Sequence, residues 1–254
     1  MLKRLFDVKR DSDMRRLTDS IGKEYAIETH MHTAEASRCA EASGSEMARF
    51  YKKLGYSGMI VTDHFFNGNT AIPPHFSWEE RVRLFCLGYE EAAREGNRIG
   101  LDVFLGWEYG YFGTEFITIG LNKEWLLSSP DVLNWGVEDY LTRVRSDGGF
   151  VIHAHPFREA PYIRSQRFFP DMVDAVEVIN SRNVQMEWDQ KAHRYALEHR
   201  LAMTSGSDSH DARVIPNGGM IMSRRPRTVM DIISDFRNGT CPRMIGSERL
   251  VSKN

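Results

Sequence analysis

Five apolar stretches of the chain each end in histidine, aspartate or glutamate. These clusters are ETHMHT (28–33), IVTDH (60–64), FLGWE (104–108), VIHAHP (151–156) and TSGSDSH (204–210). Imidazole and carboxylate groups delivered from the ends of successive strands are how a parallel barrel builds a site for several metal ions. The pattern therefore predicts a multinuclear metal centre and, with it, an enzyme.

The residue types in the first three clusters predict distinct roles. His30 and His32 lie two residues apart, and the two-residue period of an extended chain points both imidazoles toward one metal ion. We expect His64 to be a metal ligand and Asp63 to orient a neighbouring histidine. Glu108 has two carboxylate oxygens, so it can bridge two cations about 3.5–4 Å apart.

The last two clusters repeat the spacing of two. His153 and His155 are followed directly by Pro156, which ends the strand. Asp208 and His210 lie in a turn rich in glycine and serine, where the backbone can approach a ligand closely. The mixture of imidazoles and carboxylates favours Zn²⁺, Mn²⁺ or Fe²⁺ over Ca²⁺ or Mg²⁺, and the absence of a thiolate cluster argues against a structural zinc site.

Short apolar runs alternate with segments of helical period over most of the chain. The alternation predicts βαβ units and a parallel sheet, and six or seven such units are enough to close a barrel. We expect Ser43 or Ser45 to begin the first of these helices and Gly55 to end it. The expected strands are 25–29, 58–62, 101–107, 115–121, 149–154, 174–180, 201–206 and 218–223, and the expected helices are 43–55, 78–95, 137–145, 185–199 and 229–238.

Length and composition predict a single domain, residues 1–254, in an ordinary globular protein. Its core would span about 25–223, with the charged segment 1–24 and the helix 229–238 packing outside. The net charge of −2 gives no general attraction to nucleic acid or to an anionic membrane, and no apolar stretch is long enough to span one. Cys39, Cys86 and Cys241 are widely spaced, as expected for reduced thiols. We therefore expect a cytoplasmic protein with no stable nucleic-acid or membrane partner.

The motifs HMHT, TDH, GWE, AHPFR and GSDSH occur in the order and spacing of the PHP family, named for DNA polymerase and histidinol phosphatase domains. The chain resembles this family from about Tyr25 to Ser223. The resemblance implies an α/β fold, a distorted (β/α)7 TIM-like barrel, with two or three metal ions at the C-terminal ends of the strands. It also implies hydrolysis of phosphate esters as the usual chemistry.

The resemblance further implies which residues hold each ion. By it, the first metal would be bound by His30, His32, Glu108 and Asp208, the second by Glu108 and His155, and the third by His64 and His210.

The chain departs from the family pattern after the first His-X-His pair. The family usually has an aspartate there that completes the third site, where this chain reads TAEASRCAEASG (33–44). Glu35 is the best substitute, ahead of Cys39 and Glu41.

A second departure follows the glutamate motif. The family often supplies a histidine there, where this chain has EFITIGL (115–121), with Phe116 or Ile117 near that position. His153, Glu115 or extra water could fill the gap. We expect His153 instead to be a buried, hydrogen-bonded neighbour of the site, because the family pattern does not require it as a ligand.

Metal ions bound in this way would lower the pKa of water from 15.7 toward neutrality, which makes hydroxide available at pH 7. Among the motif residues, Asp208, His210 and Arg158 are expected to act most directly in catalysis. Arg158 is placed to grip a phosphate oxygen with its forked guanidinium, and Arg213 is a further substrate-binding candidate. No GxxxxGK[ST], GxSxG or GxGxxG motif is present, which excludes the nucleotide triphosphatase, α/β-hydrolase and dinucleotide-dependent classes.

Two inserts carry aromatic residues and would lie on the catalytic face. They are FFNGNTAIPPHFSW (65–78) and YIRSQRFFP (162–170). The aromatic rings could pack the loops onto the barrel, or they could stack on a base or cover a small organic substrate. We expect substrate choice to reside in these two loops.

The sequence thus predicts a metal-dependent phosphoesterase that acts on a small phosphorylated molecule, a phosphomonoester or a nucleotide, through a metal-activated hydroxide. Two alternatives remain. A phosphodiesterase or exonuclease on short nucleic acids is disfavoured by the absence of net positive charge. A C–N hydrolase of amidohydrolase type is the other, because barrels with a His-X-His motif after the first strand also perform that chemistry. A non-catalytic barrel is less favoured, since eight plausible ligands are present.

Overall fold

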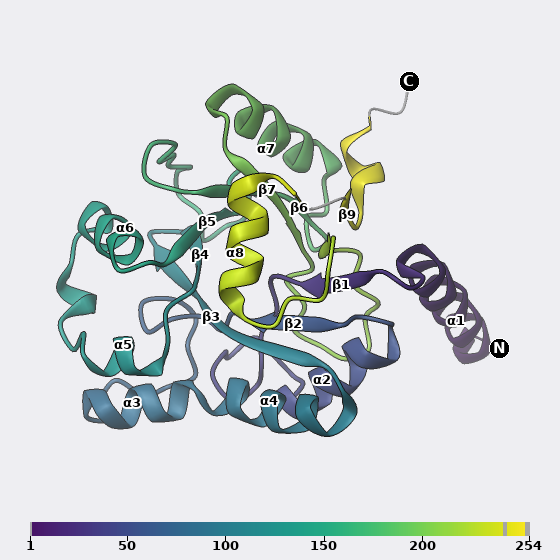
Figure 1. The fold of residues 1–254 in the computed structure, drawn as a ribbon, viewed down its shortest axis with the longest axis horizontal. Coiled ribbons are helices and arrows are strands. Elements are labelled where there is room, and N and C mark those ends of the chain that lie inside the picture. The colour runs from purple at the N-terminus through teal and green to yellow at the C-terminus, as the bar shows by residue number, and fades with distance from the viewer. Residues whose placement is uncertain (1, 241–242, 252–254) are drawn as a thin grey trace.

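A mixed β-sheet curls into a barrel and carries most of the helices on its outer side (Figure 1). The computed structural model describes residues 2–240 and 243–251. Cys241 lies outside these residues, so the expectation of a reduced thiol there is not addressed. The described strands are β1 (Tyr25–Glu28), β2 (Gly58–Val61), β3 (Asp102–Tyr111), β4 (Thr114–Ile119), β5 (Phe150–Ala154), β6 (Ala175–Asn180), β7 (Ala202–Gly206), β8 (Met220–Met222) and β9 (Arg243–Met244).

The strand order is β7-β6-β5-β4-β3-β2-β1-β8-β9. Four neighbouring pairs are parallel, namely β1 with β2, β2 with β3, β5 with β6 and β6 with β7. In contrast, β4 is antiparallel to both of its neighbours, and β8 is antiparallel to β1 and β9. The backbone N–H of Gly219 donates to Ser205 Oγ at 3.2 Å and links β7 to the start of β8. The predicted distorted α/β barrel is therefore confirmed, and the antiparallel strands are the source of its distortion.

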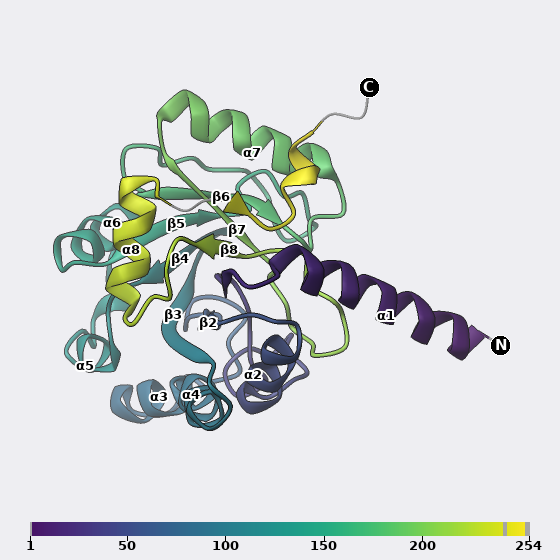
Figure 2. The ribbon, with the colours of Figure 1, turned by 45° about the vertical axis from the view of Figure 1, so that its right-hand side comes forward.

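Helices follow most of the strands. The described helices are α1 (Leu2–Ile21), α2 (Gly44–Lys53), α3 (Trp78–Phe85), α4 (Leu87–Ile99), α5 (Lys123–Leu127), α6 (Val137–Ser146), α7 (Met186–His199) and α8 (Val229–Asn238), with short 3₁₀ turns at Val132–Asn134 and Ser247–Leu250. Ser43 caps α2 through a reciprocal capping box with Glu46, as its position in the sequence predicts. The charged N-terminal segment forms α1, which extends away from the barrel in Figure 2. None of the helices in the described ranges has the length and apolar character that a membrane crossing needs.

The single helix predicted over 78–95 is wrong, because the structure contains two helices that meet at Cys86. The first residues of α4 pack closely on the neighbouring loop and on α2. A methyl group added at Gly88 would lie 1.9 Å from Thr33 Oγ1, and one added at Gly44 would lie 2.0 Å from the Gly88 carbonyl oxygen. This close approach fixes the direction of α4. The spacing of apolar residues, on which the prediction of one helix rests, contains no information about this contact.

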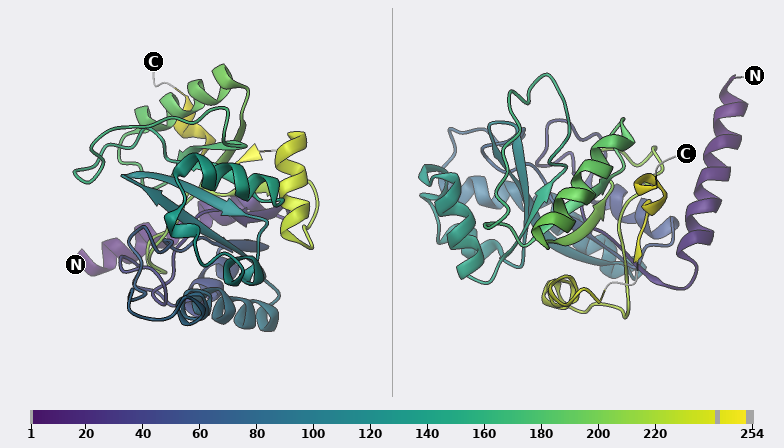
Figure 3. Two further views of the ribbon diagram at one scale, coloured as in Figure 1. Left: turned by 90° about the vertical axis from the view of Figure 1, so that its left-hand side faces the viewer. Right: turned by 90° about the horizontal axis from the view of Figure 1, so that it is seen from above.

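Apolar side chains fill the interior of the barrel away from the five clusters. Ile232, Ile233 and Phe236 of α8 belong to the same buried cluster as Ile27 of β1 and Phe150 of β5. The helix begins and ends as predicted, but it lies across one mouth of the barrel instead of on its outer wall (Figures 1 and 3). Its neighbours are the starts of parallel strands, so the opposite mouth is the one at which their C-terminal ends gather.

Candidate metal centre

Glu108 lies at the middle of the polar mouth and is almost completely buried. Its Oε1 is 3.2 Å from His30 Nε2 and 3.2 Å from His155 Nε2. Its Oε2 is 2.7 Å from His64 Nδ1 and 3.7 Å from His32 Nε2. The two carboxylate oxygens thus face different sets of imidazoles, which is the arrangement that a bridging metal ligand requires.

Two buried polar atoms in this cluster have no hydrogen-bond partner within the described chain. They are Glu108 Oε2 and His64 Nδ1, which lie close together without the geometry of a hydrogen bond. A buried polar atom without a partner costs free energy, and two ligands of one cation commonly lie this close. The donor set therefore fits a metal ion.

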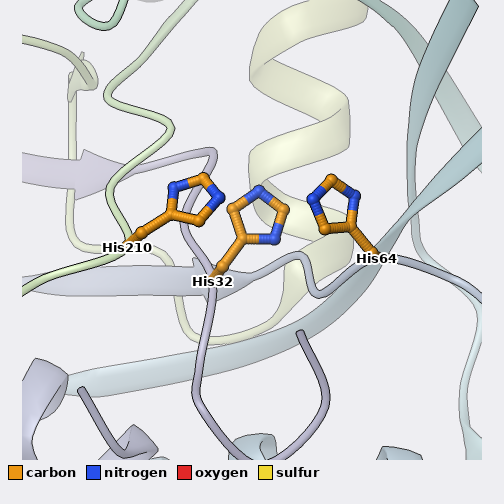
Figure 4. Close-up of side chains that lie close together, drawn as sticks. All are labelled: His32, His64 and His210. Atoms are coloured by element: carbon orange, nitrogen blue, oxygen red, sulfur yellow. The ribbon is translucent and has the colours of Figure 1, made fainter. Parts of the chain in front are cut away.

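Asp208 and His210 complete the cluster from the loop after β7. Asp208 Oδ1 is 3.3 Å from His32 Nε2 and 3.7 Å from His30 Nε2. The His210 ring lies beside that of His32, with 4.3 Å between ring centroids, and His64 lies on the other side at 4.4 Å (Figure 4). The five sequence clusters therefore meet in space at one end of the barrel.

Four overlapping groups of three residues bring potential ligand atoms within 4.8 Å of one another. They are His32, His64 and His210; His30, His155 and Asp208; His30, His32 and Glu108; and His64, Glu108 and Glu115. The overlap favours a multinuclear arrangement, because each of several residues belongs to two groups.

Backbone geometry adjusts the direction of two of these side chains. His155 has a φ of 28° and Asp208 a φ of 55°, in the left-handed region that residues other than glycine rarely adopt. The turn at Asp208 is held by its N–H, which donates to the His30 carbonyl oxygen at 2.7 Å. Strain concentrated at clustered polar residues is typical of functional sites.

The charges of the cluster depend on one another. Burial opposes charge on the Glu108 carboxyl, but His64 and His30 hold its pKa well below its usual range. Burial likewise opposes charge on Asp208, and Arg158 with His30 holds its pKa low. Both carboxylates are therefore ionised and available to a cation.

The fold of the chain is similar to the folds of several proteins of known structure. Residues 187–241 match the family described as PHP-associated. A two-domain protein from Bacteroides vulgatus that contains a predicted PHP-like metal-dependent phosphoesterase has a TM-score of 0.65 at 14% identity, over 85% of this chain and 63% of that chain. A protein from Bifidobacterium adolescentis assigned as a metal-dependent phosphoesterase has a TM-score of 0.53 at 16% identity, over 82% and 95%. The fold of the chain is therefore similar to that of these PHP-like proteins.

The similarity to PHP-like proteins that the motifs predict is thereby confirmed at the level of the fold. An amidohydrolase from Chromobacterium violaceum is also similar in structure, with a TM-score of 0.51 at 14% identity over 72% of this chain and 87% of that chain. The chain spans less than two thirds of the Bacteroides protein. No curated protein sequence matches it.

Behind the candidate metal centre, Glu177 of β6 supports two histidines at once. His30 Nδ1 lies 2.9 Å from Glu177 Oε1, while the backbone N–H of His155 donates to Oε2 at 3.0 Å. Gly206 leaves room for this carboxylate, since an added methyl group would lie 2.4 Å from its Oε1. Sequence reasoning missed Glu177, although a charged residue inside the buried run DAVEVIN (174–180) is a usable signal.

Asp63 helps to orient a histidine of the first motif, as predicted, but it does so through the Ser37 hydroxyl. Its carboxylate accepts hydrogen bonds from Thr33 N at 2.7 Å, Thr33 Oγ1 at 2.6 Å and Ser37 Oγ at 2.6 Å. Ser37 Oγ in turn lies 3.2 Å from His32 Nδ1. Asp63 therefore fixes the loop and the hydroxyl that orient His32.

Glu35 does not lie at the metal centre, so this predicted ligand is corrected. Both of its carboxylate oxygens accept from Gly44 N, at 3.1 and 3.0 Å, at the N-terminal end of α2. A carboxylate is favourable there because the first helical N–H groups lack partners. Cys39, the weaker candidate, belongs to none of the four groups of potential ligands. Burial would raise the pKa of its thiol, but the nearby His210 and His64 lower it to about 6.

His153 is not a hydrogen-bonded neighbour of the site, and this prediction is wrong. Neither of its ring nitrogens has a partner among the described residues. Its ring packs against Phe116 of β4, with 5.1 Å between centroids, and faces Tyr195. Burial and the nearby His155 lower the pKa of His153 to about 3, so it is neutral and buried among aromatic rings.

Glu115 lies beside the cluster, in the run EFITIGL (115–121) where the resemblance leaves a ligand missing. Its Oε2 is 3.5 Å from His155 Nε2, and its Oε1 is 3.8 Å from His64 Nδ1. Burial, reinforced by Glu108, raises its pKa to about 7. Of the three ways to fill that gap, this geometry favours Glu115.

Arg158 and Arg213, the two residues predicted to bind substrate, both form ion pairs within the chain. Arg158 lies 2.8 Å through Nη1 from Asp208 Oδ2, and its other nitrogens donate to Asn180 Oδ1 at 2.7 Å and Asn183 Oδ1 at 2.9 Å. It therefore positions a proposed ligand. Arg213 is exposed, and its ion-pair partners are Glu41 and Asp211.

The two aromatic inserts pack mainly onto the barrel. Phe65 is buried against Trp107 and Phe85, with centroid distances of 5.9 and 5.7 Å. In the second insert Tyr162 remains exposed. The nearby Arg158 acts to lower the pKa of its hydroxyl, against the larger effect of burial, which raises that pKa.

Proposed function

We propose that this protein is a metal-dependent hydrolase of phosphoric ester bonds. The observation that carries the proposal is the position of Glu108, whose two oxygens face two sets of imidazoles. The names of the Bacteroides and Bifidobacterium proteins support phosphoesterase chemistry. We further propose a small phosphorylated molecule, a phosphomonoester or a nucleotide, as substrate.

The proposed cation ligands are the five histidines His30, His32, His64, His155 and His210, together with Glu108, Asp208 and Glu115. Divalent zinc, manganese or iron held there would lower the pKa of water and offset charge on a phosphate. The remaining groups do the positioning. Arg158 fixes Asp208, and Glu177 fixes the rings of His30 and the turn at His155.

The surroundings of the cluster are compatible with an anionic substrate. Tyr162 is exposed and lies near Arg158, so its hydroxyl is available to donate to a substrate oxygen. The chain has a net charge of −2, so it has no general attraction for a nucleic-acid backbone. Attraction to a phosphate would therefore have to come from the bound cations themselves, which favours a small substrate over a long polyanion.

A C–N hydrolase is the second candidate. It is supported by the similarity in fold to the amidohydrolase from Chromobacterium violaceum. The same cluster of imidazoles and carboxylates can polarise an amide carbonyl as well as a phosphate. The two functions differ in the bond that is broken, so substrates distinguish them directly.

The test compares an aryl phosphomonoester, a bis-aryl phosphodiester and an aryl amide on one metal-analysed preparation. We expect two or three transition-metal ions per chain and a rate that is highest with the monoester. Replacing His32 or Asp208 with alanine should abolish that rate, while Arg213→Ala should not change it. A higher rate on the diester or the amide would replace the proposed substrate class, and a chain that binds no metal would overturn the proposal.

A further inference from the structure

The guanidinium of Arg158 is held on three sides. Its Nη1 lies 2.8 Å from Asp208 Oδ2. Its Nη2 donates to Asn180 Oδ1 at 2.7 Å, and its Nε donates to Asn183 Oδ1 at 2.9 Å. A guanidinium is planar and its N–H donors point in fixed directions, so the positions of its acceptors determine how it is oriented. The direction in which Arg158 meets Asp208 therefore depends on which end of each asparagine amide faces it.

Two carboxylates determine how these amides are turned. The Nδ2 of Asn183, which is buried, donates to Asp189 Oδ1 at 2.7 Å. An ionised carboxylate only accepts hydrogen bonds, so it takes the NH₂ end of the amide and leaves the carbonyl end for Arg158. Asn180 is fixed separately, because its Nδ2 donates to Glu177 Oε2 at 2.9 Å. Asp189 therefore sets the direction in which Asn183 presents its acceptor.

Asp189 is itself held by an arginine from the far end of the described chain. It lies in the first turn of α7 and is almost completely buried. Its Oδ2 accepts from Nε of Arg249, whose Nη2 also donates to the backbone oxygen of Asn183 at 2.6 Å. Arg249 belongs to the 3₁₀ turn Ser247–Leu250, which lies beside α7 in Figures 1 and 2. The arginine thus supplies the opposite charge that a buried carboxylate requires, and it fixes Asn183 directly as well.

We propose that Arg249 and Asp189 are positioning residues of the metal centre. Through Asn183 they orient Arg158, and Arg158 in turn orients the carboxylate of Asp208. The inference rests on the proposed metal-dependent function. Neither Arg249 nor Asp189 belongs to any of the four groups of potential ligands, so both act at a distance from the ions.

The ion pair with Arg158 determines what Asp208 offers to a cation. Arg158 lies against Oδ2, while Oδ1 is 3.3 Å from His32 Nε2 and 3.7 Å from His30 Nε2. The guanidinium thus keeps the other carboxylate oxygen directed at the two histidines. Partners of this kind, one step behind a metal ligand, commonly change metal affinity when they are replaced. The 3₁₀ turn that carries Arg249 therefore contributes to a site whose ligands come from the ends of strands.

The test measures affinity for Co²⁺ alone by competition with a chelator, so that the readout does not depend on turnover. Arg158→Gln removes the guanidinium that orients Asp208, and the affinity should fall by about 10–100-fold. Arg249→Gln should lower it by about 3–30-fold, a smaller loss because Asn180 still holds Arg158. In the double variant, Arg249→Gln should cause no further loss, since Arg158 is no longer there to be positioned.

Arg243 provides the matched control, because it is a nearby arginine that also forms an ion pair. It pairs with Glu24 and donates to the Ser20 carbonyl oxygen at 2.6 Å, and neither partner contacts Arg158. Arg243→Gln should leave the affinity for Co²⁺ unchanged. Equal losses in Arg243→Gln and Arg249→Gln, or an additive loss in the double variant, would overturn the inference.

A second variant guards against a failure to fold. Arg249→Gln leaves Asp189 buried without an opposite charge, which by itself can unfold the chain. Replacing both partners, Arg249→Met with Asp189→Leu, removes the pair without leaving a buried charge. This variant should keep its far-ultraviolet circular dichroism and still lose affinity for Co²⁺ to a similar extent as Arg249→Gln. Wild-type affinity in it would contradict the proposed role of the pair.

The same titration distinguishes this failure from that of the proposed function. If the wild type binds Co²⁺ and hydrolyses the aryl phosphate, but the affinity does not depend on Arg249, only the positioning role is wrong. If the wild type binds no Co²⁺, both the inference and the proposed function are wrong.

Discussion

Two His-X-His motifs of this chain have identical spacing, but their side chains point in different directions. His30 and His32 converge, with 3.3 Å between their Nε2 atoms. In the second motif only His155 reaches the cluster, whereas His153 lies among aromatic rings outside it. Equal spacing in the sequence therefore does not ensure a shared direction in the structure.

The difference arises from where each motif lies relative to its strand. His30 and His32 both follow the end of β1, in a loop fastened to Ser209 and Thr62. His153 is still inside β5, while His155 follows its last residue and has a positive φ. The turn at His155 redirects one side chain without moving the other. The two-residue period applies only while the backbone conformation stays the same.

The largest effect should come from removing one histidine of each motif. We expect His32→Ala to reduce hydrolysis of an aryl phosphate by roughly 10³-fold, equivalent to about 4 kcal/mol of transition-state stabilisation. His153→Leu should leave the rate unchanged, because neither nitrogen of that ring forms a hydrogen bond to the cluster. Steady-state kinetics on metal-loaded protein measure both. Equal losses in the two variants would contradict the contrast between the motifs.

A smaller effect should come from Glu177, which supports both motifs. Glu177→Gln keeps the size of the side chain but removes the charge beside His30 and weakens acceptance of the His155 N–H. We expect metal affinity to fall by about 10–100-fold. Competition with a chelator measures the affinity, and Glu198→Gln on the exposed side of α7 is the control. Unchanged affinity would mean that the first motif does not depend on this partner.

The contrast also predicts a gain in stability. His153 is buried and neutral with two unpartnered nitrogens, so His153→Leu should raise the free energy of unfolding by about 1–3 kcal/mol. Tyr195→Phe is a matched variant, because the Tyr195 hydroxyl beside it also has no partner in the described chain. Urea unfolding measures both changes. Destabilisation by His153→Leu would show that the ring makes a polar contact.

The smallest effect concerns Glu35, in the loop after the first motif. Glu35→Ala should lower the free energy of unfolding by about 0.3–1 kcal/mol, because a carboxylate is lost from the N-terminal end of α2. The number of bound metal ions should stay the same, as elemental analysis can check. A drop of one ion would return Glu35 to the centre.

The barrel and most of its proposed ligands could be predicted, because their signals are local. Each motif follows an apolar run, and the ends of parallel strands meet at one mouth. The errors concern contacts between distant segments. Glu35 accepts a hydrogen bond from the start of α2, and Arg158 forms an ion pair with Asp208. The start of α4 lies in close backbone contact with Gly44. Glu177 was missed because its role depends on two histidines from other strands. Spacing along the chain contains none of these relations.

The backbone bonds between the loops after β1 and β7 determine when a metal ion can be captured. Asp208 N donates to His30 O at 2.7 Å, and His32 N donates to Ser209 O at 2.8 Å. The ligands thus come from both ends of the barrel sequence, and long-range contacts of this kind form late in folding. A growing chain exposes His30 and His32 long before Asp208 and His210 leave the ribosome. Such a chain offers an incoming ion only part of a site, so full affinity appears only once the last parallel strand has docked.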